Sequence, residues 1–564
     1  MTTDCDVCII GSGAGGAPVA YALSKAGQSV IVLEKGPWLR DEHFYKDELA
    51  CCRRSVYTPE LRHEQHVIEE ADGKGGWRAT PTSESGWDFW NGTLVGGSSN
   101  LMSGFFHRLK PVDFRQLSEL GPIAGANRAD WPIDYADLEP YYDRVERLIG
   151  VSGHITPRPD PHPAQEPRSR ADFPYPPTAE HPVSAWIDRA CESLGFHALR
   201  VPRAILSRPD LGRRACEYSG YCGSFGCASG AKGGARAALL EPAVATGRCQ
   251  IRPKAKVHRL LSDRRGRVTA AEYVDAEGRL QQVTAKRFVV ACQAVETSRL
   301  LLGSRGPRFP DGLANNHGQV GRNLLFSAGG SGSGDLEYAS LTPEQVAQLK
   351  VMGPFVNRAL DDWYLIEDAE FAPGPHKGGI VEFLFAHPNP TGKANRAKWR
   401  DGELLWGRPL KRRLEHWFRT DRTLRFEVFC DWLPTDDCFV TLDPQVKDRW
   451  GQPVARIRTG HHPHDLRVGH YLAARGERVL REMGAVRVRS SISGAPPANL
   501  MAGGCRFGTD PATSVLDPDC RAHEVENLYV TDGSFMPTGG SVPYTWTIYA
   551  NALRVADRML QAAA

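Results

Sequence analysis

The sequence predicts an α/β fold in which a Rossmann-like dinucleotide-binding domain, assembled from separate segments, is combined with a second domain built on an antiparallel sheet. Three observations predict it. The chain begins with a strand–helix–strand pattern around a glycine-rich turn. Residues 330–460 contain strand-like runs, GGIVEFLFA and RFEVFCDWL, separated by charged turns. A last apolar strand at residues 527–530 leads into an alanine-rich helix at 545–560.

The composition is typical of a globular protein. Charged residues make up 24% and hydrophobic residues 41% of the 564 residues, which excludes a disordered chain, a collagen and a coiled coil. The net charge of +3 gives no electrostatic footprint for nucleic acid. No run approaches the roughly 18 apolar residues of a membrane span. Since no basic leader precedes the first strand, we expect a cytoplasmic protein without a membrane span.

The first elements form a β-α-β unit. Residues 7–10 predict a short apolar strand, residues 17–26 an alanine-rich helix, and residues 29–33 a second apolar strand. The turn between the first strand and the helix reads GSGAGG, which matches the spacing G-x-G-x-x-G. A turn of this kind in this position indicates a binding site for a dinucleotide.

Each glycine of the turn has a distinct role in such a site. Gly11 permits the tight turn, Gly13 lets the backbone approach a pyrophosphate, and Gly16 allows the helix to pack closely on the strand. The free N–H groups of the helix then face the phosphates. Glu34 ends the second strand, where a carboxylate would accept hydrogen bonds from an adenosine ribose.

The middle of the chain is less regular. Residues 86–104 are rich in glycine, serine and aromatic residues and predict loops that line a site. Residues 135–148 have helical spacing, and the proline-rich residues 154–182 predict an extended surface excursion. Residues 248–292 alternate like a strand meander and end in a buried strand that passes into a helix.

Three blocks together carry a family resemblance. They are the N-terminal unit, the GGSS segment at 96–99, and the C-terminal block that begins GGCRFGTDPATSVLDPDCRAHEVENLYVTDGS. In this order they resemble the glucose-methanol-choline (GMC) oxidoreductases, nearest the bacterial gluconate and sugar dehydrogenase large subunits and the enzymes that oxidise aminoglycoside sugars. The resemblance implies the GMC fold, with an FAD-binding domain interleaved with a substrate-binding domain. The FAD-binding domain would comprise residues 1–50, 85–130, 205–330 and 495–564, and the substrate-binding domain residues 131–204 and 331–494.

The resemblance also implies a function. We expect oxidation of a CH–OH group of a sugar, polyol or aminoglycoside by hydride transfer to a non-covalently bound FAD, with O₂, a quinone or a partner subunit as the electron acceptor. The positions that match the family's cofactor-binding residues are Gly11, Gly13, Gly15, Gly16, Glu34, Gly96, Gly97, Ser98, Val257, Asp532, Gly533 and Thr545.

The catalytic positions depart from the family pattern. Members usually carry a His and an Asn or second His that handle the hydroxyl proton, and here Leu500 and Pro543 occupy these positions. A neighbouring residue, Asn499 or Tyr544, could act as the base instead. The base could also come from another part of the chain, and His461 is the first candidate there. Further candidates are His462, His464, His107 and the cluster Glu367, Asp368 and Glu370. The remaining alternative is a GMC-fold flavoprotein with non-alcohol chemistry.

The segment DWYLIEDAEF also bears on the substrate. Its alternation places Glu367 with Ala369 and Phe371 on one face of a strand. If that face lines the substrate cavity, its carboxylate would suit an amino sugar. A solvated strand face is the alternative that such alternation favours.

A cysteine cluster raises a third possibility. Cys216, Cys222 and Cys227 lie within twelve residues, and thiolates at such spacing can ligate an iron–sulfur cluster. A structural role in a glycine-rich loop fits the same residues, whereas disulfides are disfavoured in the cytoplasm. If a cluster were present, the chain would serve as an electron-delivery subunit. No other metal site is expected.

Overall fold

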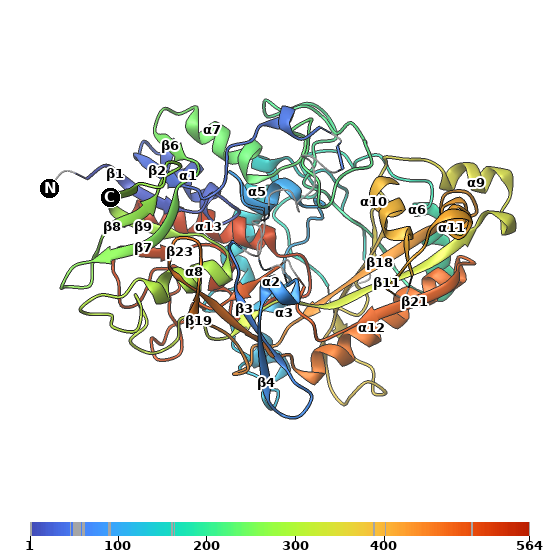
Figure 1. Ribbon diagram of the computed structural model, residues 1–564. Coiled ribbons are helices and arrows are strands. Elements are labelled where there is room, and N and C mark those ends of the chain that lie inside the picture. The colour runs from blue at the N-terminus through green and yellow to red at the C-terminus, as the bar shows by residue number, and fades with distance from the viewer. Residues whose placement is uncertain are drawn as a thin grey trace.

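The computed structural model describes residues 3–45, 47–48, 58, 63–87, 89, 92–158, 162, 164–386, 390–400, 402–497 and 500–562. Two large β-sheets dominate this part of the chain (Figure 1). The sheet near the chain ends is mostly parallel, and the other is antiparallel. The fold class predicted from the sequence is therefore confirmed, whereas the exact domain limits stay a prediction.

The mostly parallel sheet has β1 and β9 at its centre. Val7 of β1 pairs with Val30 of β2 on one side and with Arg287 of β9 on the other, in parallel register. The strands in spatial order are β6 (Cys249–Arg252), β2 (Val30–Leu33), β1 (Cys5–Ile10), β9 (Leu280–Val290), β8 (Val268–Val274) and β7 (Lys256–Ser262), with β23 (Leu528–Val530) also paired to β9. The strands β1 and β2 are buried almost throughout, as is usual for a parallel sheet covered by helices.

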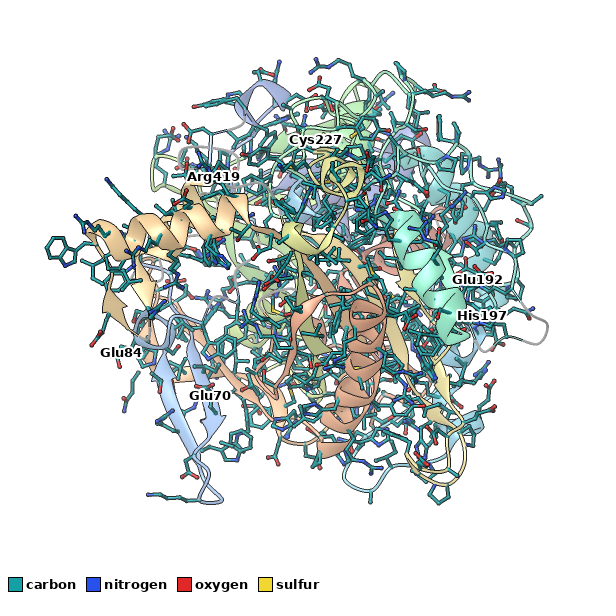
Figure 2. All side chains as sticks on the ribbon, turned by 90° about the vertical axis from the view of Figure 1, so that its right-hand side faces the viewer. Glu70, Glu84, Glu192, His197, Cys227 and Arg419 are labelled. Atoms are coloured by element: carbon teal, nitrogen blue, oxygen red, sulfur yellow. The ribbon has the colours of Figure 1, made fainter. Side chains whose placement is uncertain are left out.

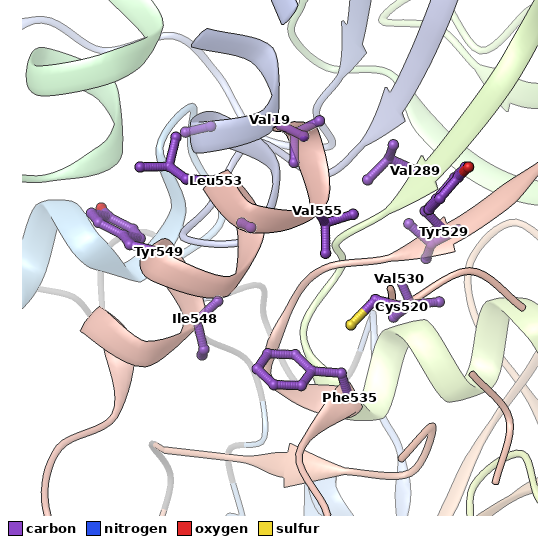
Figure 3. Close-up of a cluster of buried hydrophobic side chains, with 14 of the residues drawn as sticks. Val19, Val289, Cys520, Tyr529, Val530, Phe535, Ile548, Tyr549, Leu553 and Val555 are labelled. Atoms are coloured by element: carbon purple, nitrogen blue, oxygen red, sulfur yellow. The ribbon is translucent and has the colours of Figure 1, made fainter. Parts of the chain in front are cut away.

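Helices from both ends of the chain cover this sheet. The helix α1 (Gly16–Lys25) packs against α13 (Thr545–Gln561), which packs against α5 (Tyr135–Ile149). Figure 3 shows Val19 of α1 gathered with Leu553 and Val555 of α13 in the buried core. Other helices in this half are α7 (Glu241–Val244), α8 (Ala294–Gly303), η4 (Arg236–Leu240), η1 (Asp41–His43), η3 (Gly97–Leu101) and η6 (Gly533–Phe535).

The antiparallel sheet supplies the other half of the molecule. Its strands in spatial order are β21 (Val486–Ile492), β11 (Ser327–Glu337), β18 (Asp421–Asp431), β15 (Gly379–Phe385), β12 (Arg358–Leu360) and β5 (Ala198–Arg200). The long helix α12 (Pro463–Glu482) packs along one face of it. On this face Phe426 of β18 lies against Gly476 of α12. Residues of opposite parity on β18, such as Phe429, therefore face the other side, toward the parallel sheet.

Smaller elements complete the fold. A four-stranded sheet contains β19 (Cys438–Lys447), β20 (Pro453–Thr459), β3 (Val67–Ala71) and β4 (Trp77–Pro81). Short paired strands are β10 (Leu324–Leu325) with β22 (Ala502–Gly503), β13 (Leu365–Ile366) with β14 (His376–Lys377), and β16 (Trp399–Arg400) with β17 (Glu403–Leu404). The remaining helices are α2 (Thr82–Ser85), α3 (Pro111–Phe114), α4 (Gln116–Leu120), α6 (Ser184–Leu194), η5 (Tyr338–Ser340), α9 (Pro343–Leu349), α10 (Pro390–Ala397) and α11 (Gly407–Arg419). The last of these projects from the molecule and ends at Arg419 (Figure 2).

One predicted strand is wrong. Residues 367–371 do not extend β13, which ends at Ile366, but form a turn in which the Tyr471 hydroxyl donates a 2.9 Å hydrogen bond to Asp368. The alternation in DWYLIEDAEF therefore does not create a carboxylate face on a strand. The physical reason is that short polar side chains bind nearby backbone and favour turns over strands, as the bond from the Glu370 N–H to the Asp368 carboxylate shows.

Candidate functional site

A cavity of about 510 Å³ lies between the two large sheets. The parallel half contributes the turn after β1, the end of β2 and the start of α13, whereas the antiparallel half contributes residues of β15 and β18. This volume falls in the range of small-molecule and cofactor sites, about 300–1,000 Å³. Because both sheets line one cavity, a bound cofactor and a substrate would share it.

The turn after β1 is closed on one side and open on the other. A Cβ atom on Gly11, whose φ is +95°, would lie 2.2 Å from the Ala291 carbonyl oxygen, and one on Gly16 would lie 2.0 Å from the Gly11 carbonyl oxygen. A Cβ on Gly13 would meet no atom within 4 Å, and Gly13 lines the cavity. The turn therefore packs tightly against β9 and α1 and leaves a cradle on the cavity side, as a pyrophosphate requires.

Glu34 is held by backbone and side-chain donors around this cradle. Its carboxylate accepts hydrogen bonds from the Ser12 N–H (3.1 Å), the Ser12 hydroxyl (2.5 Å) and the Gly36 N–H (2.8 Å). The Gly96 N–H donates to the Ser12 hydroxyl oxygen at 3.0 Å and connects a second loop to the same group. A carboxylate has about four acceptor positions, so Glu34 retains capacity for a ribose hydroxyl on its cavity side.

Asp532 fixes the C-terminal side of the cradle. Its buried carboxylate accepts from the Gln293 N–H (3.0 Å), the Thr297 hydroxyl (2.5 Å) and the Ser534 N–H (2.9 Å). Burial raises the pKa of this carboxyl above its usual value, although these hydrogen bonds oppose the shift. A Cβ on Gly15 would lie 2.6 Å from the Asp532 N atom. The glycine-rich turn after β1 and the turn after β23 are therefore in direct contact.

Most of the predicted cofactor residues line this cavity. Ten of them do so: Gly11, Gly13, Gly15, Glu34, Gly97, Ser98, Val257, Asp532, Gly533 and Thr545. Gly16 and Gly96 do not appear among the lining residues and lie behind the two glycine-rich loops, which approach each other where Gly97 meets Gly13. This arrangement of open turn, held carboxylate and adjoining loops fits FAD, and the role of each residue stays a prediction.

At the other end of the cavity, Leu500 and Pro543 line the wall beside Tyr544. Leu500 has a φ of +55°, and its carbonyl oxygen accepts a hydrogen bond from the Tyr544 hydroxyl. Burial, together with the charge of Asp431, raises the pKa of Tyr544 well above its usual value. Tyr544 is therefore a protonated donor that holds the Leu500 backbone in its left-handed conformation. Its role as a base stays a prediction.

Of the other two catalytic candidates, the structure describes only His461. Asn499 lies outside the described residues. His461 is exposed, packs near Trp432 with ring centroids 6.2 Å apart, and is not among the residues that line the cavity.

The further candidates are engaged elsewhere. His462 caps α12 by accepting a hydrogen bond from the His464 N–H, and burial lowers the pKa of His464 to about 4. Glu367 and Glu370 are exposed and Asp368 is half-buried, and none of the three lines the cavity. His107 is buried, and its Nε2 atom lies 2.5 Å from Glu382 Oε1.

Sequence reasoning missed two acidic residues of the site, Glu296 and Glu427. The cavity lining contains the carboxylates Glu34, Glu296, Glu427 and Asp532. Glu296 lies 3.1 Å from His66 Nε2 and 3.4 Å from Arg299. Burial acts to raise the pKa of Glu296, but Arg299 and the contact with His66 hold it well below the usual value. Glu427 has no ion pair within the described part of the chain. The signal for it was present in RFEVFCDWL, where a Glu shares the alternate face with Phe429.

The three cysteines of the predicted cluster form no disulfide. Cys216, Cys222 and Cys227 are free thiols that pack in one small cluster, and Cys222 lines the cavity. Among the described residues, no group of three His, Cys, Asp or Glu side chains is arranged to hold a metal ion. The predicted iron–sulfur cluster thus finds no support. Within the same residues, no helix is long and apolar enough to cross a membrane.

Comparisons with known proteins agree with this geometry. Models of the GMC oxidoreductase family match residues 75–327 and 434–552, and a model described as an FAD binding domain matches residues 6–44. The chain is similar to 6'''-hydroxyparomomycin C oxidase of Streptomyces lividus, with 33% identity over 97% of this chain and 90% of that protein. It is also similar to paromamine 6'-oxidase of Streptomyces fradiae, with 34% identity over 98% of this chain and 90% of that protein.

The fold has a counterpart among solved structures. A structure of formate oxidase from Aspergillus oryzae superimposes with a TM-score of 0.65 at 17% sequence identity, over 100% of this chain and 99% of that one. At this identity the likeness concerns the fold alone. The family models and the two relatives show that the chain belongs to the GMC oxidoreductase family of FAD-dependent enzymes.

Proposed function

We propose that this protein oxidises a CH–OH group of a sugar, polyol or aminoglycoside by transferring a hydride to FAD. One observation carries the proposal: a single cavity joins the glycine cradle of the parallel half to a wall formed by the antiparallel sheet. Two relatives that match almost the whole chain are named as oxidases of paromamine and of a hydroxyparomomycin, which supports an aminoglycoside within this class.

Different residues of the cavity would bind different parts of FAD and of the substrate. The turn at Gly13 would receive the pyrophosphate, Glu34 the ribose, and the loop at Gly97 and Ser98 would pass beside the isoalloxazine ring. When bound, FAD supplies the hydride acceptor. Leu500, Pro543 and Phe429 line the wall with apolar surface, which excludes water from the reacting carbon. The hydrogen bond from Tyr544 to the Leu500 carbonyl fixes that wall.

The hydroxyl proton requires an acceptor. Neither Leu500 nor Pro543 can accept a proton, and in the described structure the Tyr544 hydroxyl acts as a donor. The candidates Tyr544, Asn499 and His461 therefore stand as predictions that single variants test. The same observation favours a second candidate function, a GMC-fold flavoprotein with non-alcohol chemistry, because the two positions usually occupied by proton-handling residues are apolar.

The location and the electron acceptor belong to the proposal as well. All twelve cysteines that the structure describes are free thiols, which suits the reducing cytoplasm that we propose. O₂, a quinone and a partner subunit remain the acceptor classes.

Anaerobic flavin spectroscopy tests the function. The purified protein is mixed with sugars, polyols and aminoglycosides in the absence of O₂, and the flavin absorbance is followed. We expect bleaching with one substrate class, since hydride transfer reduces the flavin. A flavin that dithionite reduces but no alcohol does would overturn the proposal in favour of non-alcohol chemistry.

A further inference from the structure

Two carboxylates lie side by side on neighbouring strands of the antiparallel sheet. Glu382 of β15 and Glu427 of β18 are partners in the antiparallel register. Their neighbours at the same parity, Leu384 and Phe429, line the cavity, so the pair lies on the cavity face of the sheet. Directly opposed side chains have Cβ atoms about 4.5–5.5 Å apart, and like charges at this separation repel. The fold therefore holds a repulsive pair beside its main cavity.

Glu382 forms the deeper half of this pair. Its side chain is completely buried, and its Oε1 atom lies 2.5 Å from Nε2 of His107, itself buried. Its second oxygen, Oε2, is also buried and has no hydrogen-bond partner in the described residues. An unsatisfied buried carboxylate oxygen is costly. Glu382 is not among the residues that line the cavity, so its charge acts on a ligand there from behind Glu427.

Glu427 forms the outer half and lines the cavity. Burial and the nearby charge of Glu382 raise the pKa of its carboxyl, and the charge of Arg425 opposes the shift. The other cation facing the pair is Arg203, which is stacked between Phe105 and Phe355 and donates to Asn357 and to the Ser103 carbonyl. Neither arginine forms an ion pair with Glu427 among the described residues.

We infer that Glu427, with Glu382 behind it, binds the protonated amine of the substrate. An ammonium group carries three N–H donors and one positive charge, so it can pair with Glu427 and relieve the repulsion between the two carboxylates. A metal ion is disfavoured because no group of three suitable ligands exists in the described part of the chain. This inference rests on the proposed function and narrows its substrate class to amino sugars.

The geometry separates this role from that of a catalytic base. Asp431, whose charge acts on Tyr544, lies four residues beyond Glu427 on β18. At about 3.3 Å per residue, this places the backbone of Glu427 about 13 Å from that end of the strand. Phe429 lies between them and lines the apolar wall. We therefore assign Glu427 to the positioning of a substrate group away from the wall at Leu500, Pro543 and Tyr544.

A comparison of two substrates in two variants tests the inference. The probes are paromamine and its N-acetylated derivative, which keeps the sugar hydroxyls but removes the positive charge. Glu427→Gln keeps the side-chain shape, and Glu415→Gln, on the exposed helix α11, serves as the matched control. In Glu427→Gln we expect KM for paromamine to rise by about 10²-fold, since a buried charge loses its partner, with flavin reduction at saturation changed less than about threefold. The N-acetylated probe should react equally with both variants.

Calorimetric binding to the oxidised, flavin-loaded protein gives a readout independent of turnover. Paromamine should bind more tightly as the pH rises through the pKa of Glu427, because only the ionised carboxylate attracts the amine, and this dependence should vanish in Glu427→Gln. Glu382→Gln should weaken binding of the amine by a smaller factor.

The outcomes separate the inference from the proposed function. Equal binding of paromamine by the wild type and by Glu427→Gln would overturn the inference alone, even if alcohols reduce the flavin. A reduction rate that falls equally for both probes in Glu427→Gln would assign this residue to proton transfer and overturn the positioning role. If paromamine binds as expected but no alcohol reduces the flavin, the ammonium site stands and the proposed function fails.

Discussion

The two ends of the cavity are built in different ways. At the cradle, every carboxylate is already engaged: Glu34 accepts from Ser12 and Gly36, and Asp532 accepts from Gln293, Thr297 and Ser534. At the antiparallel sheet, Glu427 faces the cavity without an ion pair in the described residues, next to Glu382 with its unsatisfied oxygen. The cradle is thus complete as a scaffold, whereas at the sheet end Glu427 has no ion-pair partner among the described residues.

This difference indicates what each end recognises. A cofactor common to a whole family is held by backbone N–H groups and glycine-permitted turns, which tolerate little change. A substrate is recognised by individual side chains on a rigid sheet, which can change without disturbing the fold. Variants at the two ends should therefore fail differently, the first in flavin content and the second in substrate choice.

The largest effect is expected at the open side of the cradle. In Gly13→Trp, the new side chain meets no atom of the protein near its Cβ and extends into the cavity, so the protein should fold but retain no flavin. The visible flavin absorbance per protein, measured after purification, checks this. Lys25→Trp, at the exposed end of α1, is the control and should keep its flavin. Retained flavin in Gly13→Trp would remove the cradle from the cofactor site.

Acid should lower the stability of the antiparallel half of the molecule through protonation of His181. Its ring lies 4.8 Å from Phe385, which lines the cavity, and burial with the charge of Arg422 lowers its pKa from 6.5 to about 4. Since the folded pKa is depressed, the stabilisation is fully present above pH 6.5 and is lost as the pH falls toward 4. The loss should reach up to about 3 kcal/mol of unfolding free energy.

Denaturant unfolding at several pH values measures this effect. His181→Gln should flatten the pH dependence between pH 6.5 and 4, whereas His317→Asn, at an exposed site, should leave it unchanged. An unaltered pH slope in His181→Gln would show that other groups control the acid response of this half.

A smaller effect is expected at Glu34. In Glu34→Gln, the amide can no longer accept from both the Ser12 and the Gly36 donors as a carboxylate does. Loss of one hydrogen bond to a charged group costs about 2 kcal/mol, so the Kd for FAD should rise by about 10–10²-fold. Flavin titration of the apoprotein checks this, with the exposed Glu84→Gln (Figure 2) as control. An unchanged Kd would exclude Glu34 from cofactor binding.

The smallest effect concerns Tyr544. Tyr544→Phe removes the donor to the Leu500 carbonyl and should lower the free energy of unfolding by about 1 kcal/mol, with flavin reduction slowed less than tenfold. Denaturant unfolding and stopped-flow reduction measure the two quantities, with Tyr21→Phe on α1 as control. A decrease in the reduction rate of about 10²-fold or more would instead establish Tyr544 as the base.

Much of the fold could be predicted because its signals are local. The β-α-β unit was expected at 7–10, 17–26 and 29–33 and is observed as Cys5–Ile10, Gly16–Lys25 and Val30–Leu33. The helix expected at 135–148 is observed as Tyr135–Ile149, and the one expected at 545–560 as Thr545–Gln561. Hydrophobic periodicity and glycine placement encode these elements within a few neighbouring residues.

The substrate end could not be predicted in the same way. The segment 367–371 has the alternation of a strand but forms a turn, whereas Glu427 was one polar residue within an apolar run. Its significance depends on Glu382, which the sheet register places opposite it, and on His107, which contacts Glu382 from 275 residues away in the chain. No pattern within a short stretch of sequence predicts these contacts between distant residues.

The sequence by itself determined the cradle, because adjacent glycines and a strand-terminal glutamate define the backbone path that a dinucleotide needs. Only the tertiary structure decided the substrate end, because there the chemistry depends on distance between side chains from different strands. The hydrogen bond from Tyr544 to Leu500 and the opposed pair Glu382 and Glu427 arise when separate segments pack together. Neighbouring residues determine the backbone conformation of such a turn, whereas the pairing of charged groups on different strands arises only in the folded chain.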